Sequence, residues 1–337
     1  MDKKVLIEAM GRPWFLEPQS AAAYAAIIHR LIAGENVSNF FENEEIKEFA
    51  FVVNASGKRI GGIEDAADNG VAVINLKGAV MKYDYCGAPG TQSLMKALDA
   101  ANSNPSVSGI VLQIDSPGGS VDGTQQFANA VKNSKKPVVA YINGMMASAA
   151  MWIGSAASQR IASSNTDIIG SIGTMASWAD YKGAYESKGV KFHEVYATDS
   201  TQKNIGHREA SQGNYEPLIK HTLDPMNNQF TAAIQANIPG VDPTVLNGAH
   251  YIATEAKKKG LVDKIGTFEQ AVKTAAQLGK QQQTTKQHTM VSFENTIKAS
   301  NSEGFDVVEG GFLATEDQLN AIEATLTENA STIADQT

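Results

Sequence analysis

The feature of the sequence that most restricts the fold is a pair of near-continuous apolar runs, each followed by a helical pattern. The runs are GIVLQI at residues 109–114 and PVVAYI at residues 137–142. A strand with one face in water alternates apolar and polar residues, whereas strands as apolar as these are buried on both faces. Strands of this kind, separated by helices, form a parallel sheet with helices on each side. The sequence therefore predicts an α/β fold.

The same alternation continues through the middle of the chain. Strands are expected near residues 71–77, 108–114, 137–142, 160–162, 171–177 and 191–197. Helices are expected near residues 91–102, 123–133 and 179–188, and from about residue 148. A longer helical stretch covers about 214–237, where Pro225 should kink or divide it. A short strand and a helix within 260–279 complete the pattern.

These patterns divide the 337-residue chain into four segments. They are an N-terminal helix near 19–33 with an irregular extension (1–70), the α/β domain (71–279), a polar linker (280–289) and an acidic tail (290–337). The linker, KQQQTTKQHT, has no apolar face to bury. The tail has one helical pattern, around 315–327, and is expected to be partly disordered.

Composition narrows the classes of function. The net charge is −8, from 28 basic and 36 acidic residues, without a cluster of Lys and Arg, so a nucleic-acid partner is not expected. No apolar run approaches the ~18 residues that a bilayer span requires, so we expect no membrane segment and a cytoplasmic location. The six histidines are scattered, and neither a metal nor another cofactor is expected. Cys86 is the only cysteine, so an intrachain disulfide is excluded.

The first of two glycine-rich turns follows the strand GIVLQI. This strand ends at Asp115, and Ser116-Pro117-Gly118-Gly119 forms the turn before the next helix. Glycines without a Cβ allow backbone N–H groups to approach a ligand closely, and the helix N-terminus that follows adds positive potential. An oxyanion hole has these requirements. A tight strand-to-helix turn without a ligand is the alternative.

The second turn follows PVVAYI and brings Ser148 to the start of a helix among small residues. A serine at this position has its hydroxyl beyond the end of the sheet, and the N–H of Ala149 points the same way. This suits a nucleophile, but it also suits a simple N-cap serine, whose hydroxyl only satisfies the helix. The second turn alone does not decide between the two.

In combination, the two turns resemble a known family. D-S-P-G-G at 115–119, followed by G-x-x-A-S at 144–148, is similar to the motifs of the signal peptide peptidase A family of serine peptidases, family S49, and of their phage head-maturation relatives. G-S-I-G at 170–173 and G-L-V-D at 260–263 follow in the same order, and the N-terminal PWFLEPQ resembles the phage subgroup. The resemblance covers about residues 71–275. It implies the fold shared by ClpP and crotonases.

A serine nucleophile needs a base, and the residue types permit histidine or lysine. No histidine lies near Gly173, where a ClpP-like triad would place one. The resemblance implies a lysine in the loop TDSTQKN, which follows the expected strand FHEVYA, and this lysine is Lys203. His207 is the nearest rival. A lysine that accepts a proton must be neutral, and burial favours the neutral form of an amine.

The resemblance implies a role for each site residue. The expected roles are Ser148 as nucleophile, Lys203 as base, the N–H groups of Gly119 and Ala149 as oxyanion hole, Gly118 and Ser120 beside the substrate, and Ser171 as a hydrogen-bond partner that orients the lysine. This sequence departs from the family in one respect, because alanines rather than glycines follow the nucleophile. Alanine keeps the N–H and adds a methyl group, so the hole is retained and the adjoining pocket is expected to narrow.

The function implied is a serine endopeptidase with a Ser-Lys dyad that processes capsid or scaffold proteins in phage head maturation. Its location would be the host cytoplasm or the phage prohead, and its tail would be scaffold-like. Relatives assemble as rings in which neighbouring subunits complete the sites, so a homo-oligomer is expected. Two alternatives remain: a catalytically inactive capsid-assembly component, and a crotonase-like acyl-CoA enzyme. The serine at the turn and the lack of a basic patch for a CoA phosphate count against the second alternative.

Overall fold

The structure is a computed structural model of the chain. It describes residues 14–16, 48–67, 69–85, 87–178, 180, 182–299, 306–308, 311–313 and 315–334. The chain divides into two units, Met1–Gln277 and Leu278–Thr337. The helix expected near 19–33 lies outside the described residues.

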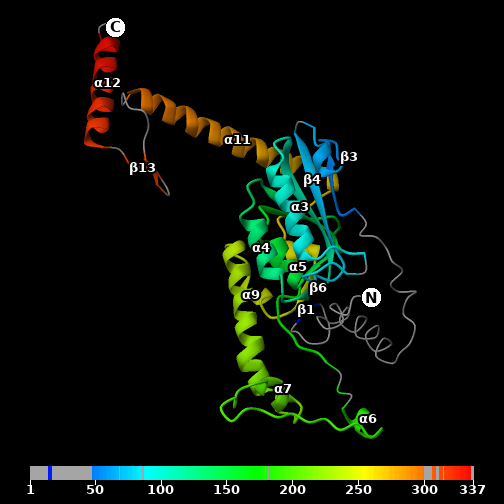
Figure 1. The fold of residues 1–337 in the computed structure, drawn as a ribbon. Coiled ribbons are helices and arrows are strands. Elements are labelled where there is room, and N and C mark those ends of the chain that lie inside the picture. Colours follow the sequence, from blue (N-terminus) through cyan, green and yellow to red (C-terminus); the bar gives the residue numbers. More distant parts are fainter. Residues whose placement is uncertain are drawn as a thin grey trace. The chain divides into compact units, whose positions relative to one another are not determined.

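The first unit is built on one mixed sheet (Figure 1). The strands follow one another across the sheet in the order β10 (His250–Ile252), β9 (Ile168–Gly170), β7 (Val138–Ala147), β5 (Val107–Ser116), β4 (Gly70–Lys77), β2 (Ala50–Val53) and β3 (Arg59–Gly61). Beside β7 lies β8 (Gln159–Ala162), which also pairs with β11 (Lys264–Ile265). The pairings of β5 with β4 and β7, and of β7 with β8 and β9, are parallel. The predicted α/β class with a parallel central sheet is confirmed.

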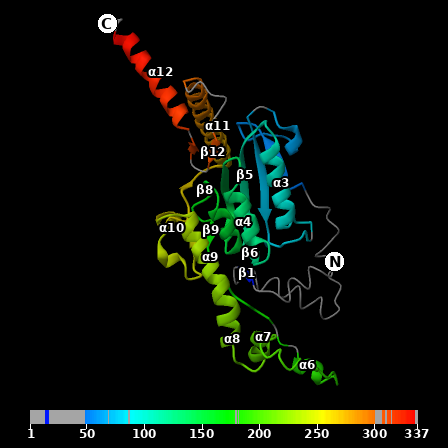
Figure 2. The same ribbon diagram turned by 60° about the vertical axis from the view of Figure 1, so that its left-hand side comes forward.

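One face of this sheet is covered by α3 (Thr91–Ser103), α4 (Thr124–Lys132) and α5 (Ala149–Ser155) (Figures 1 and 2). Ile110, Leu112 and Ile114 alternate along β5 and join the buried cluster of this face. Leu94 of α3 and Phe127 of α4 belong to the same cluster, and neither is exposed. Burial of each such side chain stabilises the fold by roughly 1.5–3 kcal/mol.

The first turns of α11 (Phe268–Ala299) cover the opposite face of the sheet. A Cβ on Gly109 would overlap the carbonyl of Ala275, so this glycine allows the helix to lie directly against β5. The rings of Tyr141 and Phe268 meet edge to face with centroids 5.6 Å apart. Because both faces are covered, the central parts of β5 (residues 110–112) and β7 (residues 138–142) are apolar at every position, as the sequence indicates.

Two strands of the main sheet, β2 and β3, precede residue 71, where we predicted that the sheet domain begins. β2 pairs antiparallel with β4, and a turn from Asn54 to Gly57 leads to β3. The Asn54 side chain accepts hydrogen bonds from the N–H groups of Ser56 and Lys58, at 3.1 and 2.9 Å. The prediction of an irregular segment up to residue 70 is therefore wrong from Ala50 onward. Four apolar residues among polar neighbours are too few to show a period, and the pairing with β4 makes them a strand.

Two predicted strands are absent from the described residues. Instead of a strand at 171–177, β9 ends at Gly170, because Ser171 has a φ of 52° and its N–H bonds to the C=O of Ala249 at 2.7 Å. The expected strand at 191–197 has no ladder partner among the described residues, and Val195 is 94% exposed. An apolar run alone does not make a strand where no neighbour pairs with it. The helix expected near 179–188 is α6 (Lys182–Glu186).

The long helical stretch is divided as Pro225 predicts. It consists of α8 (Glu216–Leu218), a π turn (Ile219–Leu223) and α9 (Asp224–Asn237), with Pro225 in the first turn of α9. A proline has no N–H to donate, and its ring displaces the preceding carbonyls, so the helix widens just before it. Phe230 of α9 stacks on Trp152 of α5, with ring centroids 5.0 Å apart. This contact secures α5 in the core.

The second unit begins within α11, which is helical through residues 280–289. We predicted this polar segment as a linker without an apolar face. A helix satisfies its backbone hydrogen bonds internally, so a segment of this kind can be helical without a partner. Beyond it, β12 (Asp306–Val308) pairs with β13 (Gly311–Leu313), and α12 (Glu316–Ala334) includes the helical pattern expected near 315–327. None of the described helices is both long and apolar enough to cross a bilayer.

The G-L-V-D segment has a structural role in the first unit. Asp263 accepts hydrogen bonds from the backbone N–H and the guanidinium of Arg160, at 2.6 and 2.8 Å. The Arg160 side chain is 8% exposed, whereas that of Asp263 is 35% exposed. A charge this buried is tolerated only when it is paired. Asp263 therefore holds β8 and β11 together.

We predict that Asp263→Ala lowers the free energy of unfolding by about 3 kcal/mol, because it leaves the buried guanidinium of Arg160 unpaired. Urea denaturation of the purified protein measures this change. Glu255→Ala is the control, because it removes a surface ion pair to Lys258 and should cost less than about 1 kcal/mol. Equal losses for the two variants would contradict the role assigned to Asp263.

Candidate active site

Three chain turns meet at one edge of the sheet, because parallel strands end on the same side. Ser116 of β5 lies in register with Met146 of β7, and Ala147 of β7 lies in register with Gly170 of β9. The N–H of Ser148 donates to the C=O of Gly170 at 2.8 Å. The two turns that the sequence singles out are therefore neighbours in space. Ligands bind at this edge in open α/β sheets.

Ser148 lies on a strained strand-to-helix turn. Its φ is 54° and its ψ −118°, and the residue is 1% exposed. A non-glycine residue in such a region costs about 1–3 kcal/mol. Its Oγ has no hydrogen-bond partner among the described residues, and it does not cap α5, although Ser148 is the N-cap residue. The simple N-cap alternative is therefore wrong. Nucleophile elbows likewise place a serine on a strained strand-to-helix turn.

The Gly118-Gly119 pair is required by backbone geometry. Gly118 has a φ of 95°, in the region that favours glycine. A Cβ on Gly119 would overlap the backbone of Val80, which runs directly alongside β6 (Gly118–Ser120). Val80 donates its N–H to the C=O of Gly118 and accepts the N–H of Ser120, each at 2.8 Å. Because backbone groups alternate sides along a strand, the N–H of Gly119 points away from Val80.

Asp115, at the start of the first turn, bridges β5 and β7. Its carboxylate accepts the N–H of Met145 and fills the space beside Gly144, where a Cβ would lie 2.7 Å from Oδ1. Burial raises the pKa of this carboxyl above its ordinary value, and Asp167 adds to the rise, whereas the Met145 N–H and Lys77 oppose it. Asp115 therefore positions the last part of β7, just before Ser148.

Three further predicted residues lie around the same edge. Ala149 is the first residue of α5, so its N–H has no acceptor within the helix. The Oγ of Ser120 accepts the N–H of Asp122 at 3.2 Å, and Ser120 is fully buried. Ser171 is 6% exposed and lines a cavity of about 350 Å³, together with Gly173 and Asn227. Its expected contact with Lys203 is not among the hydrogen bonds of the described residues.

The two candidate bases lie on a different part of the unit. Lys203 is exposed, and α7 (Ile205–Ala210), which begins two residues later, lies well away from α5 (Figures 1 and 2). His207 is also exposed, and its ring packs edge-on against Trp178. Neither side chain is hydrogen-bonded to Ser148, whose Oγ has no partner among the described residues. The described chain thus brings Ser148, Ala149 and β6 together, but not a base.

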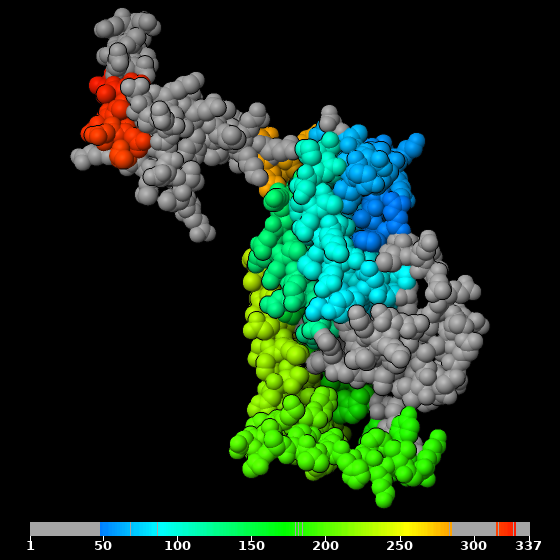
Figure 3. All heavy atoms as spheres, viewed as in Figure 1, coloured from blue at the N-terminus to red at the C-terminus, as the bar shows by residue number. Residues whose placement is uncertain are grey.

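The segment that carries both candidate bases has an unusually apolar surface. It connects β9 to α9, is green in Figure 3 and protrudes from the lower end of the unit. Its side chains with 40% or more exposure include Trp178, Val190, Phe192, Val195 and Tyr215. Large exposed apolar side chains gathered on one segment are typical of a site of contact with another molecule. We refer to residues 174–215 as the arm.

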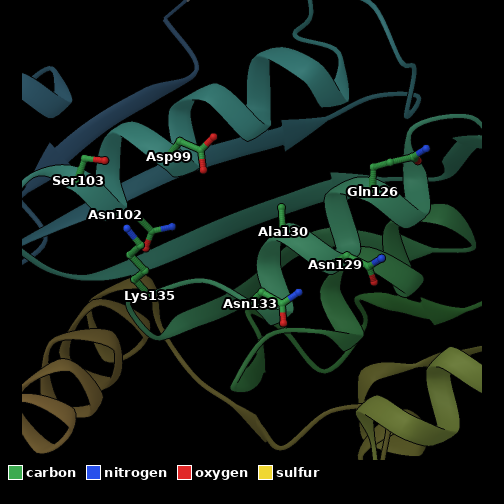
Figure 4. A pocket seen from close by; sticks show the side chains of 8 residues that line it. All are labelled: Asp99, Asn102, Ser103, Gln126, Asn129, Ala130, Asn133 and Lys135. Atoms are coloured by element: carbon green, nitrogen blue, oxygen red, sulfur yellow. The ribbon is translucent and has the colours of Figure 1, made fainter. Parts of the chain in front are cut away.

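A larger cavity lies elsewhere on the same unit. It has a volume of about 590 Å³ and is lined by polar side chains from α3, α4 and the loop after α4 (Figure 4). Its lining residues are Asp99, Asn102, Ser103, Gln126, Asn129, Ala130, Asn133 and Lys135. None of them belongs to the strand ends that carry Ser148 or Gly119. Within the described part of the chain, no three metal-binding side chains gather as a metal centre would require.

Sequence reasoning missed two parts of this edge. The first is Val80, which acts through its backbone and therefore leaves no signal in its side chain. The second is β1 (Trp14–Leu16), which pairs antiparallel with β6. Its three apolar residues are too short a run to predict either a strand or its partner.

The class that this fold and edge define is a ClpP-like α/β domain with a serine at the strand-to-helix turn. The family model of Clp protease matches residues 74–174, and that of peptidase family S49 matches residues 130–282. Together they cover the sheet from β4 to β11. The resemblance to family S49 is confirmed, and over these residues the chain is similar to these peptidases.

Curated relatives include bacterial and phage proteins. "Protease 4" of Haemophilus influenzae is 31% identical over 64% of this chain and 36% of its own length. "Capsid assembly protease C" of Escherichia phage lambda is 28% identical over 76% of this chain and 61% of its length. "Head-tail preconnector protein GP5" of Enterobacteria phage P21 is 25% identical over 81% of this chain and 56% of its own length. The chain therefore spans between about a third and three fifths of the length of these relatives.

We predict that Gly119→Ala lowers the free energy of unfolding by about 1–3 kcal/mol, because the new methyl group forces β6 away from Val80. Urea denaturation tests this. Gly183→Ala is the matched control, since no atom lies within 4 Å of its Cβ position, and it should change stability by less than about 0.5 kcal/mol. A Gly119→Ala variant as stable as the control would contradict the close approach.

Proposed function

We propose that the chain is a serine endopeptidase in which Ser148 is the nucleophile. The observation that supports this most directly is the hydroxyl of Ser148, which is buried, has no partner among the described residues and belongs to a residue with a positive φ. A buried hydroxyl without a hydrogen bond costs about 1–3 kcal/mol, and the backbone strain adds to it. A serine with only a structural role would gain by forming a bond. Buried polar groups without a hydrogen bond, and strained backbone, are typical of sites where a reacting group must remain free.

The proposed reaction proceeds through an acyl-enzyme. Ser148 Oγ bonds to the scissile carbonyl carbon as its proton passes to a neutral lysine amine, and the carbonyl electrons move to the oxygen. The N–H groups of Gly119 and Ala149 hold this oxyanion. The C–N bond then breaks, and the leaving nitrogen takes the proton from the lysine. Water attacks the ester in the same way, releases the carboxylic acid and restores the Ser148 hydroxyl.

We further propose that Lys203 of a neighbouring copy is the base. Within one chain Lys203 is exposed and lies on the arm. The apolar side chains of the arm are exposed to solvent in a monomer. An arm docked on a second copy would bury these side chains and could carry its lysine to the next Ser148. Burial at such a contact favours the neutral amine that the reaction requires. Ser171, at the rim of the cavity beside the site, is the proposed partner that orients this amine.

The proposed substrates are capsid or scaffold proteins in the assembly of a phage head. Two relatives have names from phage head assembly, a capsid assembly protease and a head-tail preconnector protein. The proposed location is the host cytoplasm or the prohead, as a homo-oligomer. An inactive assembly component would share the fold, and the tests below separate it from a peptidase.

We predict that Ser148→Ala abolishes hydrolysis of fluorescein-labelled casein without a loss of stability. Removal of a nucleophile costs several orders of magnitude in rate. The free energy of unfolding should stay equal or rise, because a buried hydroxyl without a partner is removed. Mass spectrometry after treatment with a fluorophosphonate should show one adduct, on Ser148, in the wild type only.

Ser155→Ala is the matched control for this variant. Ser155 is also buried on α5, but its hydroxyl donates to the C=O of Trp152 at 2.7 Å and accepts from Asn237. This variant should lose about 1–3 kcal/mol of stability and keep its activity. Casein hydrolysis by Ser148→Ala would end the proposal. A wild-type protein that neither hydrolyses casein nor forms the fluorophosphonate adduct would end it as well.

We predict that Lys203→Ala is inactive alone but restores activity when mixed with Ser148→Ala. If the base comes from a neighbour, random mixing of equal amounts of the two variants leaves about a quarter of the sites with both an intact Ser148 and an intact Lys203. Lys203→Arg should be inactive at every pH, because arginine stays charged, whereas the wild-type rate should rise with pH. Inactive mixtures of exchanging subunits would contradict a base in trans. If Lys203→Ala is active and His207→Ala is inactive, the base is His207 and not Lys203.

A further inference from the structure

The N-terminal strand β1 lies on the strand that carries the proposed oxyanion donor. β1 lies beside β6 (Figures 1 and 2) and pairs antiparallel with it. In this pairing Phe15 lies directly opposite Gly119. The two strands form a small sheet separate from the main sheet. β1 therefore completes no part of the main sheet, and the reaction proposed above does not use it.

The register determines which backbone groups of β6 face β1. The C=O of Gly118 and the N–H of Ser120 are both bonded to Val80. Both backbone groups of Gly119 therefore point to the opposite side, toward Phe15. In an antiparallel ladder this makes Phe15 and Gly119 the hydrogen-bonding pair, with the C=O of Phe15 facing the N–H of Gly119. A peptide carbonyl of the chain itself thus faces the donor proposed to hold the oxyanion.

We propose that Trp14–Leu16 is an internal pseudo-substrate, an extended segment that occupies the peptide-binding edge of β6 and must leave before a protein substrate binds. This inference rests on the proposed function, because it takes the N–H of Gly119 as the donor for a scissile carbonyl. Only one strand at a time can pair with this edge of β6. The segment and an extended substrate peptide therefore compete for the same hydrogen-bonding groups.

The segment is built to be released. Three of its residues pair with β6 in the described part of the chain, and its sequence neighbours include Pro13 and Pro18. A proline has no N–H to donate, so neither residue can extend the ladder through its nitrogen. A strand this short, outside the main sheet, is held by few hydrogen bonds. It blocks the edge while competing substrate is scarce and yields to a longer peptide.

The first test removes the backbone donor of the segment in the full-length chain. Phe15→Pro should raise kcat/KM for fluorescein-labelled casein by lowering KM at unchanged kcat. The gain is about 10-fold if the segment occupies the edge for nine tenths of the time. Phe15→Leu is the matched control, because it keeps the N–H and should behave like the wild type. Equal kcat/KM for a folded Phe15→Pro variant and the wild type overturns the inference.

The second test locks the segment in place. Trp14 lies opposite Ser120, and because their neighbours are the hydrogen-bonding pair, their Cα atoms are expected about 4.5 Å apart, within disulfide reach. Trp14→Cys with Ser120→Cys, in a Cys86→Ser background, should hydrolyse casein several-fold more slowly when oxidised than when reduced. Ser120→Cys alone in the same background gives the reference rate, because Ser120 is itself expected beside the substrate. Oxidised and reduced forms of equal activity overturn the inference. This variant decides the question if Phe15→Pro does not fold.

A binding measurement separates this inference from the proposed function. The fluorescein-labelled peptide GRPWFLEP, residues 11–18, should bind Phe15→Pro at least about 10-fold more tightly than the wild type, whose edge is occupied. A scrambled peptide should bind neither protein. If the peptide binds but casein is not hydrolysed and Ser148 is not labelled, the proposed peptidase activity is refuted. The edge of β6 as a peptide-binding site would still be supported. The pseudo-substrate alone would be refuted if the protein hydrolyses casein but neither Phe15→Pro nor the disulfide changes the rate, and the peptide binds both proteins equally.

Discussion

The backbone hydrogen bond from the N–H of Ser148 to the C=O of Gly170 joins the end of β7 to the end of β9. On both sides of this bond the chain leaves ordinary strand geometry, because Ser148 has a φ of 54° and Ser171 a φ of 52°. Each such residue costs about 1–3 kcal/mol, so the surrounding structure must hold it in place. Parallel pairing of β7 with β5, β8 and β9 supplies this constraint. The Trp152–Phe230 stack fixes the helix that follows.

The same edge concentrates groups that a purely structural edge would avoid. In the part of the chain that the structure describes, the buried Ser148 hydroxyl has no partner, and Gly119 lies against Val80 with no room for a Cβ. These features cost stability, and the apolar core on both faces of β5 and β7 offsets the cost. An arrangement that is unfavourable for folding persists where it serves another purpose. The strain and the free hydroxyl belong to the same residue, and this supports the proposal of chemistry at Ser148.

The sequence predicts the parallel core because burial on both faces leaves a continuous apolar signal in β5 and β7. It also predicts the place of Ser148 and of Gly118-Gly119, since strand ends and glycine turns are local. The strain at Ser148 and the packing of Gly119 against Val80 arise from tertiary contacts, which no local pattern encodes. For the same reason β2 was missed, and the run at 191–197 was assigned to a strand although no partner pairs with it. The role of Asp263 became clear only from its contact with the buried Arg160.

The two proposals place separate restraints on one isolated chain. The base is absent from the described edge because Lys203 lies on the arm, and substrate access is limited because β1 faces Gly119. The first restraint acts on proton transfer and the second on binding, so their effects multiply rather than add. Oligomer assembly removes the first restraint, and a high local concentration of substrate removes the second. A peptidase restrained in both ways is active only where copies of the chain and their substrate are brought together, as in an assembling particle. Before assembly, each restraint alone would protect the chain and its partners from premature cleavage.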